Sequence, residues 1–313
     1  MVLELTGIRK TYRGGVEALK GIDLSVPRGC IYGLLGPNGA GKSTLVKILT
    51  TLIQKTDGSG TMLGAPIGNR SVLGKVGLLP EHARFPDYLT GRQVIEYSAG
   101  LNGITANSIQ PKIAELLQMV GMAEAQGMKI KQYSKGMKQR IGIAQALIND
   151  PEIIFLDEPT DGVDPAGRRD FRELIRNLRE QGKTVFINTH QLSELEPVVD
   201  RVAILSQGTM IGEGPIETLR AEEVSYRIDY EGVLSPDAMN RFSSDLVTVE
   251  NGFLKVKAEQ AMAVQPLIDE LRSSGVVISG VQRSQQSLEE LYLGMVGRAQ
   301  PSAQPSASPP PLV

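Results

Sequence analysis

The stretch "GPNGAGKST" at residues 36–44 is a glycine-rich loop of the kind that wraps around phosphate groups. It fits the pattern G-x-x-x-x-G-K-[ST], in which glycines let backbone N–H groups face a phosphate and the following helix adds its positive dipole end. Lys42 can then reach the β and γ phosphates, and the Ser43 hydroxyl can ligate Mg²⁺. The predicted nucleotide-binding residues are Gly36, Pro37, Asn38, Gly39, Ala40, Gly41, Lys42, Ser43 and Thr44.

The flanking sequence predicts an α/β fold of the P-loop NTPase kind. A continuous apolar run, "CIYGLLG" at 30–36, precedes the loop, and a helix is expected from about Ser43. Two more apolar runs, "IIFLD" at 153–157 and "TVFINT" at 184–189, are typical of strands buried on both faces. Helical spacing over 166–182 lies between them, so strand, crossover helix and strand indicate a parallel sheet.

Other segments differ in texture from this core. Residues 1–28 contain short alternating runs that predict an antiparallel β subdomain, and 88–148 is predicted to be a helical subdomain. Residues 224–297 are predicted to form a small α+β domain with the ferredoxin-like order β-α-β-β-α-β, closed by a helix capped at Ser287. The Pro/Ser/Ala-rich tail at 298–313 is expected to be disordered.

Composition excludes several classes of protein. The 313 residues are 41% hydrophobic and 22% charged, which is ordinary for a folded soluble protein. A net charge of −2 provides no general attraction to nucleic acid or acidic lipid. The single cysteine, Cys30, cannot form an intramolecular disulfide. We find neither a signal-peptide core nor about 18 uninterrupted apolar residues, so we expect a cytoplasmic protein that does not itself span a membrane.

A second cluster of functional residues is predicted in "IIFLDEPT" at 153–160. Asp157 ends a buried strand, where α/β sheets present ligand groups, and can hold Mg²⁺ alongside Ser43. Glu158 follows and can polarise the water that attacks a γ phosphate. For an isolated Asp-Glu pair the better interpretation is a solvent-facing strand end, but the apolar run before it and the phosphate loop favour a catalytic role for Glu158.

His190 follows the strand at 184–189. A lone histidine is more often structural, but this strand is predicted to run parallel to the one that ends at Asp157. The His190 side chain is therefore expected at the same sheet edge, in reach of a γ phosphate. The other histidine, His82, has no such placement and is expected on the surface.

The stretch "YSKGMKQR" at 133–140 has no group for catalysis, yet it forms a Ser-x-Gly turn ahead of a helix. A helix N-terminus, a serine hydroxyl and free backbone N–H groups together make an anion site. Taken alone, the stretch is better interpreted as the solvated start of a basic helix. The basic residues around it are Lys129, Lys131, Lys135, Lys138 and Arg140.

Taken together, the order of these motifs resembles that of the ATP-binding-cassette (ABC) family over residues 1–222. The resemblance implies that two cassettes sandwich two ATP molecules head to tail. It further implies that Ser134 and Gly136 contact the ATP of the partner subunit, that Tyr12 stacks on adenine, and that Asp164 belongs to the D-loop at the dimer interface.

Two positions depart from the usual family pattern. The signature is usually Leu-Ser-Gly-Gly-Gln, whereas "YSKGM" at 133–137 lacks the first glycine and the glutamine. Glu81 stands where the family has the glutamine of its Q-loop, and its carboxylate can still bind Mg²⁺ or water. Both features resemble the cassettes of drug-resistance-type ABC exporters, whose permease is a separate polypeptide.

The resemblance therefore implies the ATP-hydrolysing subunit of an ABC transporter, with ATP and Mg²⁺ as cofactors. We expect an exporter subunit that forms a homodimer at the cytoplasmic face of the cell membrane, attached peripherally to a separately encoded permease, with no nucleic-acid partner. One alternative is a soluble ABC ATPase that acts on ribosomes or DNA, although such proteins usually carry two cassettes or a long coiled-coil insert. A second is a regulatory module that uses ATP only to dimerise. A P-loop kinase would need neither the signature nor the "DEPT" strand.

Overall fold

The computed structural model of the chain describes residues 1–104, 106–221, 224–234, 246–250, 252–258, 260–285 and 288–299. The chain divides into two compact units. The first contains Met1–Gly214 together with the chain from Met295 onward, and the second contains Pro215–Gly294. The domain boundary expected at 222–224 stays a prediction.

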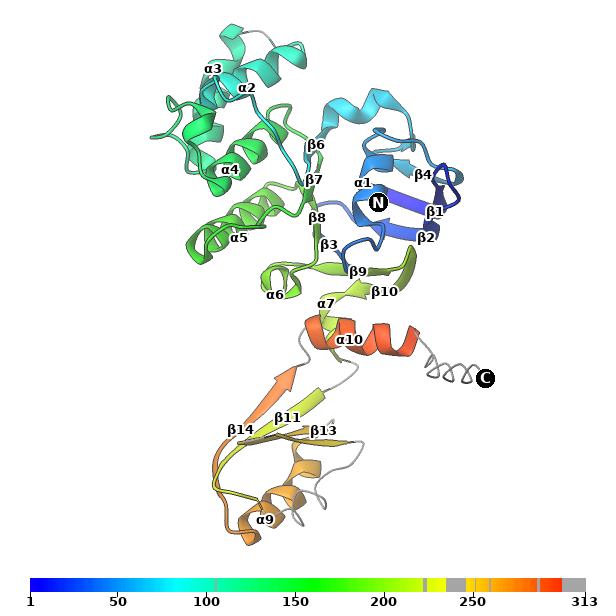
Figure 1. The fold of residues 1–313 in the computed structure, drawn as a ribbon, viewed down its shortest axis with the longest axis vertical. Coiled ribbons are helices and arrows are strands. Elements are labelled where there is room, and N and C mark those ends of the chain that lie inside the picture. The colour runs from blue at the N-terminus through cyan, green and yellow to red at the C-terminus, as the bar shows by residue number, and fades with distance from the viewer. Residues whose placement is uncertain are drawn as a thin grey trace, which may run out of the picture. The chain divides into compact units, whose positions relative to one another are not determined.

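A six-stranded sheet forms the centre of the first unit, with the strand order β10-β9-β3-β8-β7-β6 (Figure 1). The pairings of β3 with β8 and β9, and of β7 with β6 and β8, are all parallel, as the apolar runs predict. Every residue of β3, β7 and β8 is buried, as expected for central strands covered on both faces. The strands are β3 Ile31–Leu35, β6 Val76–Leu79, β7 Ile153–Asp157, β8 Thr184–Thr189, β9 Arg201–Ser206 and β10 Thr209–Pro215.

A second sheet, with the order β2-β1-β4-β5, is antiparallel. Its strands are β1 Leu3–Thr11, β2 Glu17–Val26, β4 Asp57–Met62 and β5 Ala65–Pro66. The alternating burial along β1 and β2 confirms the prediction of antiparallel strands in residues 1–28. Tyr12 directly follows β1, so this sheet brings it toward the phosphate loop.

The helices of the first unit start at clear sequence signals. Thr90 and Gln93 form a capping box at α2, and Ser134 caps α4. Asp164 caps α5, which has Pro165 at its first position. The helices are α1 Lys42–Leu49, η1 Arg70–Lys75, α2 Gly91–Leu101, α3 Ala106–Met119, η2 Ile130–Gln132, α4 Lys135–Ala146, α5 Pro165–Glu180 and α6 Leu192–Leu195. Helices α2, α3 and α4 gather on one side of the central sheet (Figure 1), and the described part of 88–148 is helical with no named strand.

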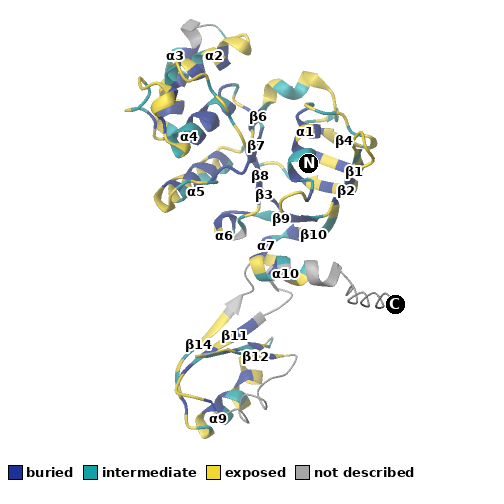
Figure 2. Cartoon of the chain, in the orientation of Figure 1, coloured by how far each residue is buried: buried dark blue, intermediate teal, exposed yellow. Residues whose placement is uncertain are grey.

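The main core joins the two sheets of the first unit around α1 (Figure 2). Helix α1 packs against both β2 and β7. Three fully buried aromatic rings from adjacent central strands lie in the middle of this core. The rings of Tyr32 and Phe186 are stacked at 5.5 Å between centroids, and Phe155 lies 5.3 Å from Phe186. This packing fixes the strands whose ends carry the predicted site.

The second unit contains a four-stranded antiparallel sheet with the order β12-β13-β11-β14. This is the strand order of a ferredoxin-like arrangement, but the first predicted helix, at 235–244, and the predicted cap Ser287 lie outside the described residues. The complete arrangement therefore stays a prediction. The elements that begin in this unit are α7 Ile216–Ala221, β11 Val224–Glu231, β12 Val247–Glu250, β13 Phe253–Lys257, η3 Ala261–Val264, α9 Gln265–Ser273, β14 Val277–Gln285 and α10 Leu288–Ala299, whose residues from Met295 belong to the first unit.

In the part of the chain that the structure describes, none of the helices combines the length and the apolar character that a membrane crossing demands.

Candidate nucleotide-binding site

The glycine-rich loop connects the carboxyl end of β3 to α1, which begins at Lys42. Gly41 forms the N-cap of α1 with φ of 109°, a left-handed conformation that residues with a side chain rarely adopt. A Cβ at Gly41 would lie 2.6 Å from the backbone oxygen of Ala18. Glycine is thus required here for both conformation and space, so that the helix N-terminus can face the cleft.

We expect Gly41→Ala to lower the free energy of unfolding of the ligand-free protein by roughly 2–4 kcal/mol, because a strained φ and a backbone clash add. Gly39→Ala is the matched control: its φ is 80°, but a Cβ added there would meet no heavy atom within 4 Å. Its loss should be only about 1–2 kcal/mol, the cost of a left-handed residue. Urea unfolding of both variants tests this, and equal losses would contradict the close approach to Ala18.

The loop opens into a cleft with a volume of about 530 Å³, within the usual range for small-molecule sites. Ten of the sequence-predicted residues line this cleft, namely Asn38, Gly39, Ala40, Gly41, Lys42, Ser43, Thr44, Glu81, Glu158 and His190. Ala18 and Asp161 complete the described lining. The fold therefore brings together segments that lie far apart in the sequence, as the motif analysis predicts.

Lys42 is 6% exposed, and its Nζ donates to the backbone oxygens of Gly36 at 2.8 Å and Pro37 at 3.2 Å. Burial lowers the pKa of Lys42, while the carboxylate of Glu158, 3.9 Å from Nζ, opposes that shift. An anion that approaches a partly desolvated ammonium group of this kind stabilises its charged form. The environment of Lys42 thus suits a phosphate ligand.

Asp157 ends β7 beside the loop. Its Oδ1 accepts from Ser43 Oγ at 3.3 Å and from Asn188 Nδ2 at 2.9 Å. Burial raises the pKa of Asp157, against the effect of these two hydrogen bonds. A neighbouring cation would stabilise the charged carboxylate.

The oxygen donors in the cleft fit Mg²⁺. Magnesium binds hard oxygen ligands and usually takes only one or two protein carboxylates, with waters and phosphate oxygens completing its shell. Ser43 and Asp157 provide one hydroxyl and one carboxylate in contact, and Glu81 lines the same cleft. Among the described residues there is no group of three or more His, Cys, Asp or Glu side chains suited to a metal.

Glu158 follows Asp157 and has its carboxylate at the cleft, although its side chain is only 9% exposed. Oε1 lies 2.9 Å from His190 Nδ1, and Oε2 accepts from Thr189 Oγ1 at 3.0 Å. Its backbone has φ of 48°, a left-handed value that is uncommon for a residue with a side chain and is often found at functional sites. The backbone N–H of Glu158 donates to the oxygen of Asn188 at 2.9 Å, which ties the two strand ends together.

Tyr12 lies next to the phosphate loop. Its hydroxyl is 3.3 Å from Thr44 Oγ1, and 39% of the residue is exposed. Lys10 Nζ lies 5.2 Å from the centroid of the ring. A half-exposed aromatic ring beside the loop is placed where a nucleotide base could stack on it.

The signature turn lies elsewhere on the same unit. Ser134 caps α4 by accepting from the N–H of Met137 at 3.2 Å, so the predicted turn into a helix is confirmed. A Cβ on Gly136 would lie 3.9 Å from Val163, in the loop that leads to Asp164. Among the described residues, Ser134, Gly136 and Asp164 are not part of the cleft lining. The structure thus places Gly136 beside the segment that leads to Asp164, and Lys135 of the same turn pairs with Asp161 at the edge of the cleft.

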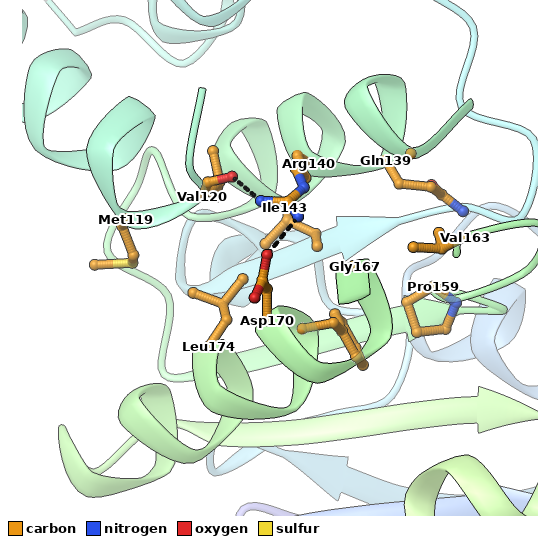
Figure 3. Close-up of a pocket in the computed structure, with 12 residues that line it drawn as sticks. Met119, Val120, Gln139, Arg140, Ile143, Pro159, Val163, Gly167, Asp170 and Leu174 are labelled. Carbon is orange, nitrogen blue, oxygen red and sulfur yellow. Dashed lines mark hydrogen bonds and ion pairs between the residues drawn. The ribbon is translucent and has the colours of Figure 1, made fainter. Parts of the chain in front are cut away.

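Contacts of Arg140 fix the N-terminal half of helix α4, which follows the signature turn. Figure 3 shows a small apolar pocket between α4 and α5, with Arg140 bridging across it. The Arg140 guanidinium donates to the backbone oxygen of Val120 at 3.1 Å and to Asp170 at 2.8 Å. Because Gly136 and Val163 also line this pocket, the signature turn and the D-loop segment share one packed support.

Three residues of this region were not predicted from the sequence. Asn188 and Thr189 are fully buried and hold the carboxylates of Asp157 and Glu158. Their signal was present, since they are polar residues at the end of an apolar strand beside the one that ends at Asp157. The third, Asp161, lines the cleft and pairs with Lys135 at 2.5 Å, and this bond from Lys135 lowers the pKa of Asp161.

Comparison with known proteins agrees with this geometry. The ABC transporter family matches residues 19–161. An uncharacterized ABC transporter ATP-binding protein of Nostoc sp. is 41% identical over 94% of this chain and 90% of its own length. A daunorubicin resistance ATP-binding protein of Streptomyces coeruleorubidus is 34% identical over 94% and 96%, respectively.

Solved structures point the same way. A dimeric ATP-binding cassette in a post-hydrolysis state, bound to ADP and Pi, is 26% identical with a TM-score of 0.63, covering 68% of this chain and 98% of that one. An ATP-binding subunit of an ABC transporter has a TM-score of 0.64 at 24% identity over 71% and 93%, which shows the shared fold. The P-loop cleft, the strand-end carboxylates and the match to relatives along nearly the whole chain lead to one conclusion: the chain belongs to the ATP-binding proteins of ABC transporters and is an ATPase.

Proposed function

We propose that this chain is the ATP-hydrolysing subunit of an ABC exporter, that two copies of it close head to tail around two ATP molecules, and that the pair drives a separately encoded membrane permease. The observation that carries the proposal is that neither Ser134 nor Gly136 is among the described residues that line the cleft of their own chain. Ser134 is exposed, and Gly136 lies beside Val163 in the segment that leads to Asp164, so a second copy could present both residues to the cleft of the first.

Binding of ATP rests on the loop and its neighbours. Backbone N–H groups at the start of α1 and the Lys42 ammonium would hold the β and γ phosphates, and Tyr12 would stack on the adenine. Ser43, Asp157 and Glu81 would hold Mg²⁺, which neutralises charge on the phosphates. These contacts would draw Lys42 away from the carbonyl oxygens of Gly36 and Pro37 that it now meets.

Hydrolysis needs an activated water in line with the γ phosphate. Glu158 is placed to orient and polarise that water, because its carboxylate is held at the cleft by Thr189 and His190. A hydrogen bond from His190 Nδ1 to the Glu158 carboxylate would stabilise its charged form. The backbone strain at Glu158 is consistent with a side chain whose direction is set for function.

The completed sandwich would use the partner's signature. The Ser134 hydroxyl and the N-terminus of α4 form an anion site, and Gly136 allows close backbone approach. Binding of ATP would then favour the closed pair, and hydrolysis would reopen it, which shifts the conformational equilibrium of an attached permease. We place the subunit peripherally at the cytoplasmic face of the membrane for this reason.

Two features support export through a separate permease. Relatives aligned along most of their length carry names such as daunorubicin resistance ATP-binding protein, which describe resistance to a drug. Another relative in Bacillus subtilis is a linearmycin resistance ATP-binding protein, 32% identical over 95% of this chain. These relatives are named as ATP-binding proteins, which supports a permease that is a separate polypeptide.

An affinity purification tests the permease. The tagged full chain is recovered from detergent-solubilised membranes in buffer with MgATP, with an untagged strain as the control. We expect a multi-span membrane protein in near-stoichiometric amount, identified by peptide mass spectrometry. Recovery of ribosomes or nucleic acid in its place, with the chain absent from the membrane fraction, would contradict the exporter and favour a soluble ABC ATPase.

A further inference from the structure

Glu194 is a buried acid that the site described above does not use. It lies in the short helix α6, four residues after His190, and is only 7% exposed. A carboxylate removed from water costs free energy unless it is paired and hydrogen-bonded. The contacts that offset this cost therefore indicate the role of Glu194.

Both carboxylate oxygens of Glu194 contact the segment that follows β7. Thr160 Oγ1 donates to Glu194 Oε2, and Thr160 is itself only 6% exposed. Arg168 Nη1 lies 2.5 Å from Glu194 Oε1, and its Nε donates to the backbone oxygen of Val163 at 2.8 Å. One carboxylate thus holds the loop 158–164 at two points, directly through Thr160 and indirectly at Val163 through Arg168.

This loop contains the side chains on which the proposed chemistry depends. It begins at Glu158, lines the cleft with Asp161 and ends at Asp164, the cap of α5. Its backbone is left-handed at both Glu158, with φ of 48°, and Gly162, with φ of 69°. Glycine adopts this conformation readily, but Glu158 has a side chain and needs surrounding contacts to hold it there.

Glu194 belongs to the segment that carries His190. The two segments already meet inside the cleft, where His190 and Thr189 contact the Glu158 carboxylate. The contacts of Glu194 to Thr160 and Arg168 join the same segments a second time, outside the cleft lining. These contacts add to the Lys135–Asp161 pair and to the bond from the Glu158 N–H to Asn188, and they fix the loop on the side that faces α6.

We propose that Glu194 is a positioning residue for ATP hydrolysis, which holds the loop 158–164 against the His190 segment so that Glu158 and Asp164 keep their places. This inference rests on the proposed catalytic roles of Glu158 and His190. A purely structural ion pair would affect stability and leave turnover per folded site unchanged. Positioning instead predicts a loss in kcat at nearly constant KM.

The first variant is Glu194→Gln, which keeps the shape of the side chain and removes its charge. An amide carries no charge for Arg168 to pair with and has only one acceptor oxygen, so the ion pair to Arg168 or the hydrogen bond from Thr160 is lost. We expect kcat per folded site to fall roughly 10- to 100-fold, with KM for ATP within about twofold of wild type. Active sites are counted by ATP binding in the same preparation, so misfolded protein does not enter kcat.

Thr160 offers a matched pair that leaves the charges intact. Thr160→Val removes the hydroxyl at equal volume and should lower kcat in the same direction, whereas Thr160→Ser keeps the hydroxyl and should restore kcat relative to Thr160→Val. Glu173→Gln is the surface control, because Glu173 pairs with Arg169 on the exposed face of α5, where both side chains are more than half exposed. It should leave kcat unchanged.

Normal kcat per folded site in both Glu194→Gln and Thr160→Val would overturn the proposal, even if both variants were less stable. Equal kcat for Thr160→Val and Thr160→Ser would overturn it as well. Glu158→Gln is measured alongside. If Glu158→Gln keeps its turnover, the proposed chemistry is wrong, whereas loss of turnover there together with normal Glu194→Gln refutes only the positioning role.

Discussion

Replacing Glu158 by glutamine is expected to lower the ATPase rate by roughly 100- to 10,000-fold, the usual contribution of a positioned general base. The carboxylate is held at the cleft by His190 and Thr189 and is 9% exposed, so an amide fits in its place without loss of packing. An amide, however, cannot polarise the attacking water. Steady-state phosphate release at saturating MgATP measures the effect.

The binding half of the same prediction separates chemistry from folding. Lys42, Ser43 and Asp157 are unchanged in Glu158→Gln, so the Kd for ATP should stay within a few-fold of wild type. ATP-dependent dimerisation should persist longer than in the wild type, because hydrolysis no longer reopens the pair. Glu173→Gln again provides a surface control for the loss of one charge. Turnover within about twofold of wild type in Glu158→Gln would remove Glu158 from the mechanism.

The second large effect is expected for Ser134→Arg, which should abolish ATPase activity while the isolated monomer still binds ATP. Ser134 is exposed and outside the described lining of the cleft in its own chain, so a large side chain there does not disturb that cleft. In a head-to-tail pair the same side chain would displace the Ser134 hydroxyl from the partner's γ phosphate and so stop hydrolysis at that one site. ATP binding by fluorescence titration and phosphate release measure the two halves.

The helix cap needs a control of its own, since Ser134 also caps α4. Losing an N-cap costs about 1 kcal/mol. Ser134→Asp keeps a good cap but directs a carboxylate at the partner's phosphate. We expect Ser134→Asp to fold as stably as wild type and still to lose ATPase activity by at least about 10-fold. Wild-type turnover in Ser134→Asp would mean that the signature does not face a phosphate.

The sequence is sufficient to predict the cleft because its signals are local. The residues of loop 36–44 and of the apolar strands before Asp157 and His190 are sufficient to predict the local structure of each segment. Because these strands are parallel, their carboxyl ends lie at the same edge of the sheet. Asp157, Glu158 and His190 are therefore found together as expected. Tyr12 and Glu81 were predicted only through family resemblance; Glu81 lines the cleft, and Tyr12 contacts Thr44 of the phosphate loop.

Strands without a local signal were not predicted, and β4 shows why. Its sequence "DGSGTM" is rich in glycine and poor in the residues that favour strands. A Cβ at Gly60 would lie 2.4 Å from the oxygen of Glu4, and one at Gly58 would lie 2.3 Å from that of Gly7. The close approach of β4 to β1 therefore requires these glycines, and the same glycines make the segment unlike a strand in sequence. Strands β5, β6, β9 and β10 were also missed, although the apolar run "VAIL" at 202–205 is a local signal for β9.

Contacts between distant segments were likewise beyond sequence reasoning. Glu194 lies in "HQLSELEP", a polar stretch that predicts an exposed surface, yet it is buried against Thr160, 34 residues earlier. Lys135 could be assigned to a basic cluster, but its partner Asp161 could not. Such pairings depend on how α4, α5 and α6 pack around the sheet, and this packing cannot be predicted from the spacing of residues along the chain.

The central claim is that two copies share each ATP site, and mixing Glu158→Gln with Ser134→Arg tests it most directly. In a mixed pair one site combines both defects, while the other combines an intact cleft with an intact signature. Subunits are mixed before nucleotide is added, and ATPase activity is compared with that of each variant alone. We predict that the two inactive variants together regain about a quarter of the wild-type rate, because random pairing makes half of the dimers mixed and each has one intact site of two. A mixture as inactive as its components would contradict the shared site.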